Sequence, residues 1–113
     1  SEQPWFVSGK DLDNNILIVT QGHDHPALFN SHCEIEGLHW INKFDIQLPF
    51  SCTAKIRYRQ QDQHCTITTI ESGIATVEFK QPQRAITPGQ ALVLYDDQVC
   101  LGGGTINKAF NLN

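Results

Sequence analysis

The chain has 113 residues, of which 40% are apolar and 18% are charged, and its formal net charge is −4. This length allows one domain with a hydrophobic core and excludes two full-sized domains. The acidic balance excludes a general polyanion binder whose whole surface is positive, and no apolar stretch is long enough to cross a bilayer.

The first elements expected are two strands at Trp5–Lys10 and Ile16–Gln21, joined by the Asp- and Asn-rich residues 11–15. Asp and Asn hydrogen-bond their own turn and tolerate left-handed backbone, so this stretch predicts a β-hairpin. The breaker cluster Gly22–Pro26 then redirects the chain.

His23, Asp24 and His25 in this cluster suit a metal ion, but one loop offers only two or three ligands, and Pro26 by itself explains the break. We favour a plain loop and assign no metal ligand. An enzyme or metal site built on His23, His25 and Cys33 stays open as an alternative.

The rest of the chain reads as short strands with turn signals between them. Apolar residues alternate from Ser31 to Ile41 but break step at Gly37, which predicts a strand with a bulge there. In the strand expected at 64–70, the side chains of Cys65, Ile67 and Thr69 should point to the same face. Further strands are expected at 51–61, 74–80, 91–95 and 98–101, a looser connection at 42–49, and turns or polar loops at 60–63, 71–73, 81–85, 87–90 and 96–97.

Gly102, Gly103 and Gly104 stand in a row near the end of the sequence. Three glycines can cradle a phosphate, but a phosphate loop normally opens a helix, and no helical pattern follows here. We favour a barrel corner where backbones approach closely. Because no segment has a 3.6-residue period, the residues predict an all-β barrel or sandwich.

Cys33, Cys52, Cys65 and Cys100 form no C-x-x-C pair, and their spacings fit no zinc module. Each lies in an apolar phase of an expected strand, and free cysteine is among the most buried residue types. We expect four reduced, structural thiols in a cytoplasmic, monomeric protein with no signal peptide and no membrane partner.

The segment Ser51–Gln61 alternates strictly and carries three of the eight Lys and Arg residues, Lys55, Arg57 and Arg59, in one phase. On a strand these side chains leave the same face about 6.6 Å apart. A repeating anion such as a nucleic-acid backbone would match such a row. The alternative is a solvated face or an edge protected by charge.

The sequence offers no catalytic constellation. His32–Cys33 and His64–Cys65 are neighbours, but neighbours on a strand point to opposite faces and make no Cys–His dyad. Asp96 and Asp97 lie in an expected solvated turn. A binding or accessory module is the reading that the residues favour.

Several motifs in order carry a family resemblance. They are P-W-F-V, K-D-L-D-N-N, Q-G-H-D-H-P, L-H-W, K-I-R-Y-R-Q-Q-D, P-Q-R-A-I-T-P-G-Q and V-C-L-G-G-G-T-I, from Pro4 to about Ile106. Together they resemble the C-terminal third of the tRNA-specific 2-thiouridylases of the MnmA type. The start at Ser1 and the lack of Met also suggest a piece of a longer protein.

The resemblance implies that the parent enzyme activates the wobble uridine of tRNA with ATP and Mg²⁺ and inserts sulfur from a cysteine persulfide. Its S-G-G-x-D-S loop and two working cysteines belong to another domain. None of the four cysteines here matches them, so no catalytic residue and no cofactor is assigned to this chain.

By the same resemblance, residues 1–26 are the tail of a central domain, and residues 27–113 are a C-terminal antiparallel β-barrel similar to domain 2 of elongation factors. The tRNA contacts carried over are Arg57, Tyr58 and Gln90. The alternation along the strand agrees with this contact for Arg57, because it places the guanidinium on the outer face, where it could make two hydrogen bonds to a phosphate. The same alternation places Tyr58 inward. Charge and phase add Lys55, Arg59 and Arg84.

The expected partners are tRNA, the catalytic domain of the same parent chain and, with the parent, a sulfur-carrier protein. The leading hypothesis is a non-catalytic, tRNA-holding barrel. The alternative is a structural barrel that braces the catalytic domain or the sulfur carrier without binding tRNA directly.

Overall fold

The structure is a computed structural model that describes residues 5–11, 16–21, 26–41, 45–57 and 60–112, with side chains from Ala27 onward. Strands dominate it, and no helix in the described segments is long or apolar enough to cross a membrane. The elements are β1 (Trp5–Asp11), β2 (Ile16–Gln21), the short 3₁₀ helix η1 (Pro26–Leu28), β3 (Phe29–Trp40), β4 (Phe50–Lys55), β5 (Gln63–Glu71), β6 (Ile74–Arg84), β7 (Ala91–Asp96) and β8 (Val99–Phe110).

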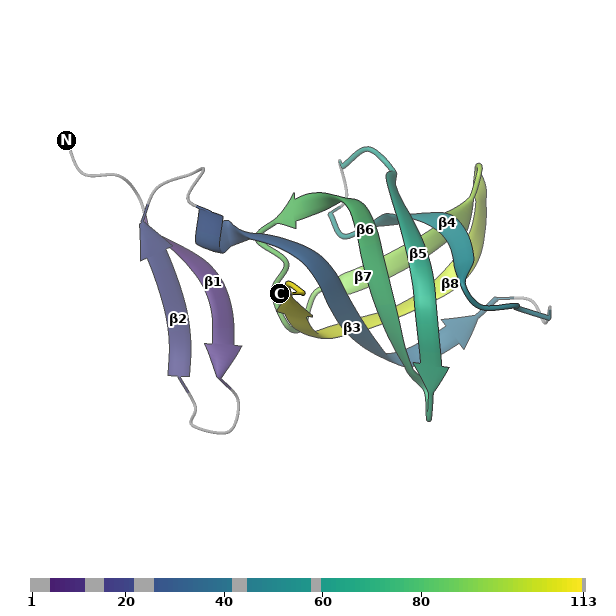
Figure 1. Cartoon of the computed structure of the whole chain (residues 1–113), viewed down its shortest axis with the longest axis horizontal. Coiled ribbons are helices and arrows are strands. Elements are labelled where there is room, and N and C mark those ends of the chain that lie inside the picture. The colour runs from purple at the N-terminus through teal and green to yellow at the C-terminus, as the bar shows by residue number, and fades with distance from the viewer. Residues whose placement is uncertain (1–4, 12–15, 22–25, 42–44, 58–59, 113) are drawn as a thin grey trace.

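Strands β1 and β2 pair with each other in a two-stranded antiparallel sheet, as the sequence predicted. The other six strands form a closed antiparallel barrel in the order β3-β6-β5-β4-β7-β8. Figure 1 shows the hairpin beside the barrel and outside its wall. The all-β barrel expected from the sequence is therefore confirmed.

The barrel is filled by alternate residues from every strand. Cys33, Ile35, Ile67, Val77 and Leu94 are among the side chains with at most 1% exposure. Because a strand sends successive side chains to opposite faces, the intervening residues point outward. On β4 this alternation buries Cys52 and Ala54 and leaves Thr53 and Lys55 half-buried on the outer face.

The predicted bulge at Gly37 is confirmed. Gly37 has a φ of 62°, and the register of β3 against β8 shifts between Glu36 and His39. Leu38 and Trp40 beyond the bulge still pack against the core. The bulge thus lets one long strand bend around the barrel while apolar side chains on both sides of the bulge still face the core.

The glycine run lies inside β8, where the strand passes between two others at close range. A Cβ atom on Gly102 would stand 2.0 Å from the carbonyl oxygen of His39 on β3, and one on Gly103 would stand 2.2 Å from that of Leu92 on β7. Both glycines pair in the ladders of the barrel. This supports the corner that we favoured over the phosphate loop.

Four expectations need correction. Strand β4 stops at Lys55, because the chain bends at Ile56 and Arg57; the basic segment is not one strand to Gln61. Strand β6 continues to Arg84, because the segment expected as a polar loop pairs with the start of β3. A register shift between Ile67 and Thr69 leaves Thr69 exposed and out of the Cys65 phase. Cys100 is only half-buried.

Candidate nucleic-acid interface

The candidate interface lies at the end of β4, where the chain leaves the barrel wall. A hollow of about 410 Å³ opens there against the outer face of β7. We call it the basic hollow, and its described lining is Lys55, Ile56, Arg57, Gln90, Ala91, Val93 and Tyr95. The fold thus brings together three of the residues singled out from the sequence, Lys55, Arg57 and Gln90.

Lys55 is held on the outer face by two partners. Its Nζ lies 3.3 Å from Oδ1 of Asp62 and 5.5 Å from the centre of the Tyr95 ring. Both charged side chains are about one-third exposed, so water screens the ion pair and it contributes less than about 1 kcal/mol. Lys55 is therefore a partly exposed cation at the rim of the hollow, with the Tyr95 ring as its second partner.

Arg57 differs from the expectation of a freely presented guanidinium. Its Nη2 donates to the backbone carbonyls of Arg84 and, at 3.0 Å, Ala85. Burial, and secondarily the nearby charge of Arg84, lower the pKa of Arg57. Arginine still keeps its proton at neutral pH, because its ordinary pKa is above about 12. Arg57 is thus a fixed positive charge in the wall of the hollow, partly engaged by its own chain.

Gln90 is also held in place. Its Oε1 accepts a hydrogen bond of 3.0 Å from the backbone N–H of Thr87, and its own N–H donates to Thr87 O at 3.2 Å. The turn Thr87–Gln90 was predicted, and Gly89 has the positive φ of 95° that it requires. The turn therefore fixes the Gln90 side chain beside the hollow.

The other sequence-derived candidates are placed less directly. Arg84 adjoins the site through its carbonyl, which Arg57 binds, but its side chain is not part of the lining. Tyr58 and Arg59 lie outside the described residues. The tRNA roles of all six residues stay predictions.

A chain of glutamines that the sequence did not reveal fastens this region to β6. Gln60 Oε1 accepts from the N–H of Ile56 at 2.9 Å, and Gln60 Nε2 donates to Gln83 Oε1 at 2.9 Å. Gln83, only 5% exposed, donates in turn to Gln63 Oε1 at 3.0 Å. Gln83 is twenty or more residues from both Gln60 and Gln63 in the sequence, so strand patterns carry no signal for these two bonds. The amide chain positions the bend that carries Arg57.

Sequence reasoning also missed the apolar floor of the hollow. On β7 Leu92 and Leu94 are buried, whereas Ala91, Val93 and Tyr95 occupy the outer phase. The apolar residues on both faces of this strand were a usable signal, because the solvated face of a strand normally carries polar residues. A partner that has both planar rings and negative charge would fit the apolar floor and the cationic rim of this hollow.

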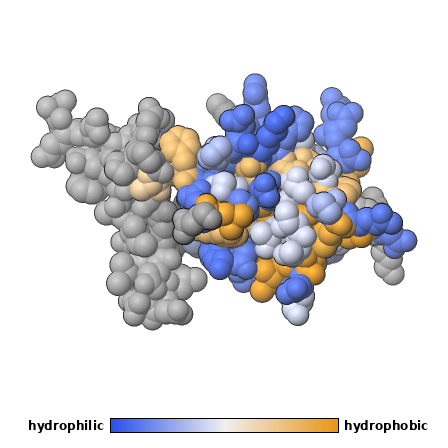
Figure 2. All heavy atoms as spheres, viewed as in Figure 1, coloured by the Kyte–Doolittle hydropathy of each residue, from blue (hydrophilic) through white to orange (hydrophobic). Residues whose placement is uncertain are grey.

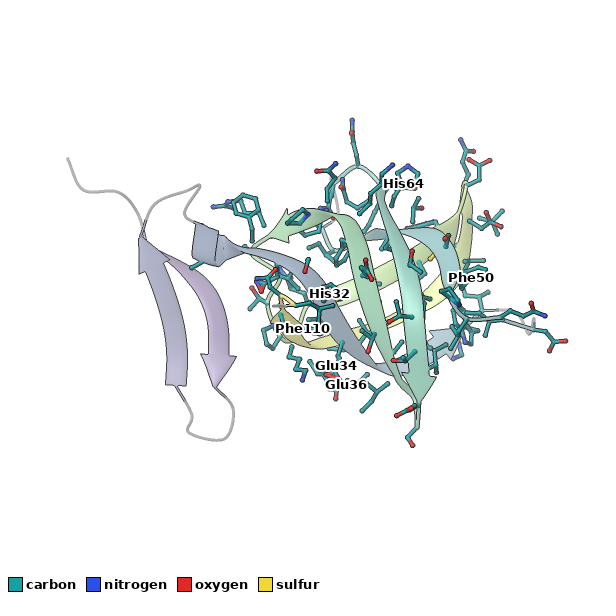
Figure 3. The ribbon with its side chains drawn as sticks, viewed as in Figure 1. His32, Glu34, Glu36, Phe50, His64 and Phe110 are labelled. Carbon is teal, nitrogen blue, oxygen red and sulfur yellow. The ribbon has the colours of Figure 1, made fainter. Side chains whose placement is uncertain are left out.

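A second hollow, of about 350 Å³, lies on the other side of Tyr95. We call it the acidic hollow; its described lining is Ser51, Cys52, Thr53, Asp62, His64, Tyr95, Asp96 and Asp97. Figure 3 shows His64 at the upper edge of the barrel.

No group of three or more His, Cys, Asp or Glu side chains in the described part of the chain could hold a metal ion. His23 and His25 lie outside that part, and Cys33 is sealed in the core, where burial raises the pKa of its thiol to about 12.

A third cluster sits at the barrel end nearer the hairpin, where Figure 3 shows His32 beside Phe110 and Glu34. The rings of His32 and Phe110 stack at 5.2 Å. Lys108 lies 3.1 Å from Glu34 and 5.5 Å above Phe110. Lys108 therefore repeats the surroundings of Lys55, a carboxylate and an aromatic ring, without an adjoining arginine or glutamine in that cluster.

Comparisons with known proteins agree with the barrel. A profile of the family described as "Aminomethyltransferase beta-barrel domain" matches residues 30–106. The chain is 51% identical over 98% of its length to the tRNA-specific 2-thiouridylase MnmA of Marinomonas sp. (strain MWYL1), of which it covers 28%. It is 57% identical over 91% of its length to that of Nitrosococcus oceani, of which it also covers 28%, and 50% identical over 96% to that of Stutzerimonas stutzeri, of which it covers 29%.

The chain thus spans less than a third of the length of these relatives. The family profile begins one residue into β3 and ends inside β8, so it covers nearly the whole barrel and leaves out the β1–β2 hairpin. On this evidence the chain belongs to the aminomethyltransferase β-barrel domain family and is similar, across nearly all its residues, to tRNA-specific 2-thiouridylases.

Proposed function

We propose that this barrel holds tRNA for a tRNA-specific 2-thiouridylase and that the basic hollow is its grip. The observation that carries the proposal is the meeting of Lys55, Arg57 and Gln90 around an apolar floor that ends in Tyr95. Cations bind phosphates, and an exposed aromatic ring stacks an unpaired base. The names of the relatives supply the substrate class.

The chemical step belongs to other parts of the parent enzyme. The resemblance calls for ATP, Mg²⁺ and a persulfide-bearing cysteine, but the residues present do not fit them. Gly102 and Gly103 are paired with neighbouring strands on both sides, and the glycine run therefore cannot wrap a phosphate. The proposed contribution of the barrel is to orient tRNA while the parent replaces oxygen by sulfur at the wobble uridine.

The test is a titration of a tRNA transcript with the parent enzyme at two salt concentrations. Lys55→Gln is the test variant and Lys108→Gln the matched control, because both lysines pair with a carboxylate and lie 5.5 Å from a ring centre. Loss of one phosphate contact should lower the slope of log K against log salt by about 1 for Lys55→Gln alone. Equal behaviour of the two variants would remove the basic hollow from the interface.

The exposed apolar residues favour a second candidate, a barrel that braces the rest of the parent. Ile41 is 56% exposed and Leu48 is 42% exposed, and both lie in the connection between β3 and β4. Figure 1 places the described part of this connection, residues 45–49, at the barrel end away from the hairpin. Figure 2 shows hydrophobic residues among hydrophilic ones on the barrel face in view. Unchanged tRNA affinity in Lys55→Gln, with weakened binding of the catalytic part by Ile41→Ser, would support the brace.

A further inference from the structure

Cys52 and Cys65 face each other across neighbouring strands. They are register partners in the antiparallel pair of β4 and β5, and their sulfur atoms lie 3.7 Å apart. Among the described residues both are free thiols. Neither takes part in the proposed grip on tRNA.

The strand geometry allows these two sulfurs to be joined. Directly paired residues of an antiparallel ladder have Cα atoms about 4.5 or 5.5 Å apart, and disulfides span Cα separations of about 4.4–6.8 Å. Paired Cβ atoms, however, lie about 4.5–5.5 Å apart, at or above the upper end of the disulfide range of about 3.5–4.5 Å. A bond here would form under some strain, and strained disulfides are the easily reduced ones.

The two cysteines differ in their exposure. Cys52 is 9% exposed and is one of the residues that line the acidic hollow, whereas Cys65 is 4% exposed and is not among the described lining residues. The hydrogen bond between them lowers the pKa of Cys52 and raises that of Cys65, which agrees with the position of Cys52 at the hollow and makes it the expected nucleophile. Both side chains belong to the buried core, and Cys52 is the expected attacking thiol with Cys65, its register partner, as the resolving thiol.

The lining of the hollow selects the oxidant. Asp62, Asp96 and Asp97 surround the approach to Cys52, with His64 as the neighbouring titratable group. Carboxylates repel anionic oxidants such as glutathione disulfide but not a small neutral hydroperoxide. We propose that Cys52 and Cys65 form a reversible cross-strand disulfide when a hydroperoxide enters the acidic hollow.

The reaction balances in two steps. The Cys52 thiolate attacks one peroxide oxygen, the O–O bond breaks, and the departing hydroxide takes a solvent proton to leave Cys52 as a sulfenic acid. The Cys65 sulfur then attacks the Cys52 sulfur; the S–S bond forms, the S–O bond breaks, and the hydroxyl group leaves with the Cys65 proton as water. Two thiols are oxidised by two electrons, and one hydrogen peroxide becomes two waters.

The disulfide closes a ring around the proposed grip. The two cysteines are 13 positions apart, and Lys55, Arg57 and Gln60 lie between them. Oxidation therefore adds a covalent link between the two ends of the segment that carries Lys55 and Arg57, whereas the reduced form holds this segment by noncovalent contacts.

The experiment treats the protein with hydrogen peroxide, blocks free thiols, and maps the non-reduced tryptic peptides by mass spectrometry. Lys55, Arg57 and Arg59 are cleavage sites between the two cysteines, so a linked pair of peptides reports the bond directly. We expect a Cys52–Cys65 linked pair, about 2 Da lighter than the sum of its reduced peptides, that dithiothreitol releases. Recovery of Cys52 as a free thiol, or its linkage to Cys33 or Cys100 instead, would overturn the proposal.

Two variants keep the test decisive if the linked peptide is scarce. Cys65→Ser removes the resolving thiol, so Cys52 should accumulate as a sulfenic acid that dimedone traps; absence of the adduct in folded protein would contradict the proposal. Cys100→Ser should leave the yield of the linked pair unchanged. Glutathione disulfide at the same concentration should give much less of the bond than hydrogen peroxide, and equal yields would refute the selection by charge. None of these readouts involves tRNA, so their failure leaves the proposed function untouched.

Discussion

The basic hollow and the acidic hollow share Tyr95 as a common wall but differ in the charges around them. Lys55 and Arg57 line the first, whereas Asp62, Asp96 and Asp97 line the second. A nucleic acid that approaches this face is attracted to one side of the tyrosine and repelled from the other. The difference teaches how a chain of net charge −4 can offer a phosphate site: its acidic residues help to define the edge of that site.

The largest expected effect destroys both hollows together. In Gly103→Ala the new Cβ would stand 2.2 Å from Leu92 O and force β8 away from β7, whose outer face forms part of both hollows. We expect destabilisation on the order of 3 kcal/mol, since no flexible side chain can yield there. Chemical denaturation measures it. Gly73→Ala, at a turn with nothing within 4 Å of the new Cβ, is the control for a glycine loss with only a backbone cost.

The next variant removes the wall that the two hollows share. Tyr95→Ala deletes the ring beneath Lys55 and should weaken binding of tRNA about tenfold, because stacking of one base contributes about 1–3 kcal/mol. Tyr95→Phe keeps the ring and should bind nearly as the parent does. Binding that falls equally in both variants would show that the hydroxyl, and not the ring, makes the contact.

A smaller effect is expected from the basic side alone. Lys55→Gln should weaken tRNA binding about threefold to tenfold at low salt and much less at high salt, because the contact is screened within about 10 Å at 0.1 M. Fluorescence anisotropy at two ionic strengths measures it beside Lys108→Gln. An effect that does not depend on salt would contradict a phosphate contact at Lys55.

The smallest effect, of opposite sign, comes from the acidic side. Asp97→Asn removes a charge from the acidic hollow, and Asn also tolerates the φ of 55° at this position. We expect up to about twofold tighter tRNA binding at low salt, since a nearby repulsion is removed. Weaker binding would mean that Asp97 itself contacts the RNA.

Much of the barrel was predictable because its signals are local. The bulge at Gly37 and the Thr87–Gln90 turn follow from alternation and turn chemistry within a few residues. The extent of β4 and β6 was not, because polar residues at a strand end look like a loop until their partner strand is known. Strand β6 reaches Arg84 because Gln83 and Arg84 pair with the start of β3, some fifty positions earlier.

The candidate site shows the same division. The alternation of side chains along the strand predicts that Lys55 lies on the outer face, and the structure places it there. What the residues could not give is the pairing of Lys55 with Val93, which creates the basic hollow, or the two carbonyls that engage Arg57. Both depend on which strands become neighbours when the barrel closes. Charge patterns locate a cation, whereas tertiary contacts decide how free it is.

The barrel is sealed by pairing its earliest strand, β3, with its latest, β8, and the Asn111 side chain clasps that seam at Ser31 N and Phe29 O. During synthesis the cylinder consequently stays open until residues near position 110 have left the ribosome. The first and last residues of the barrel then lie side by side. The domain can therefore be joined to another enzyme at one place, without the chain having to pass through either fold.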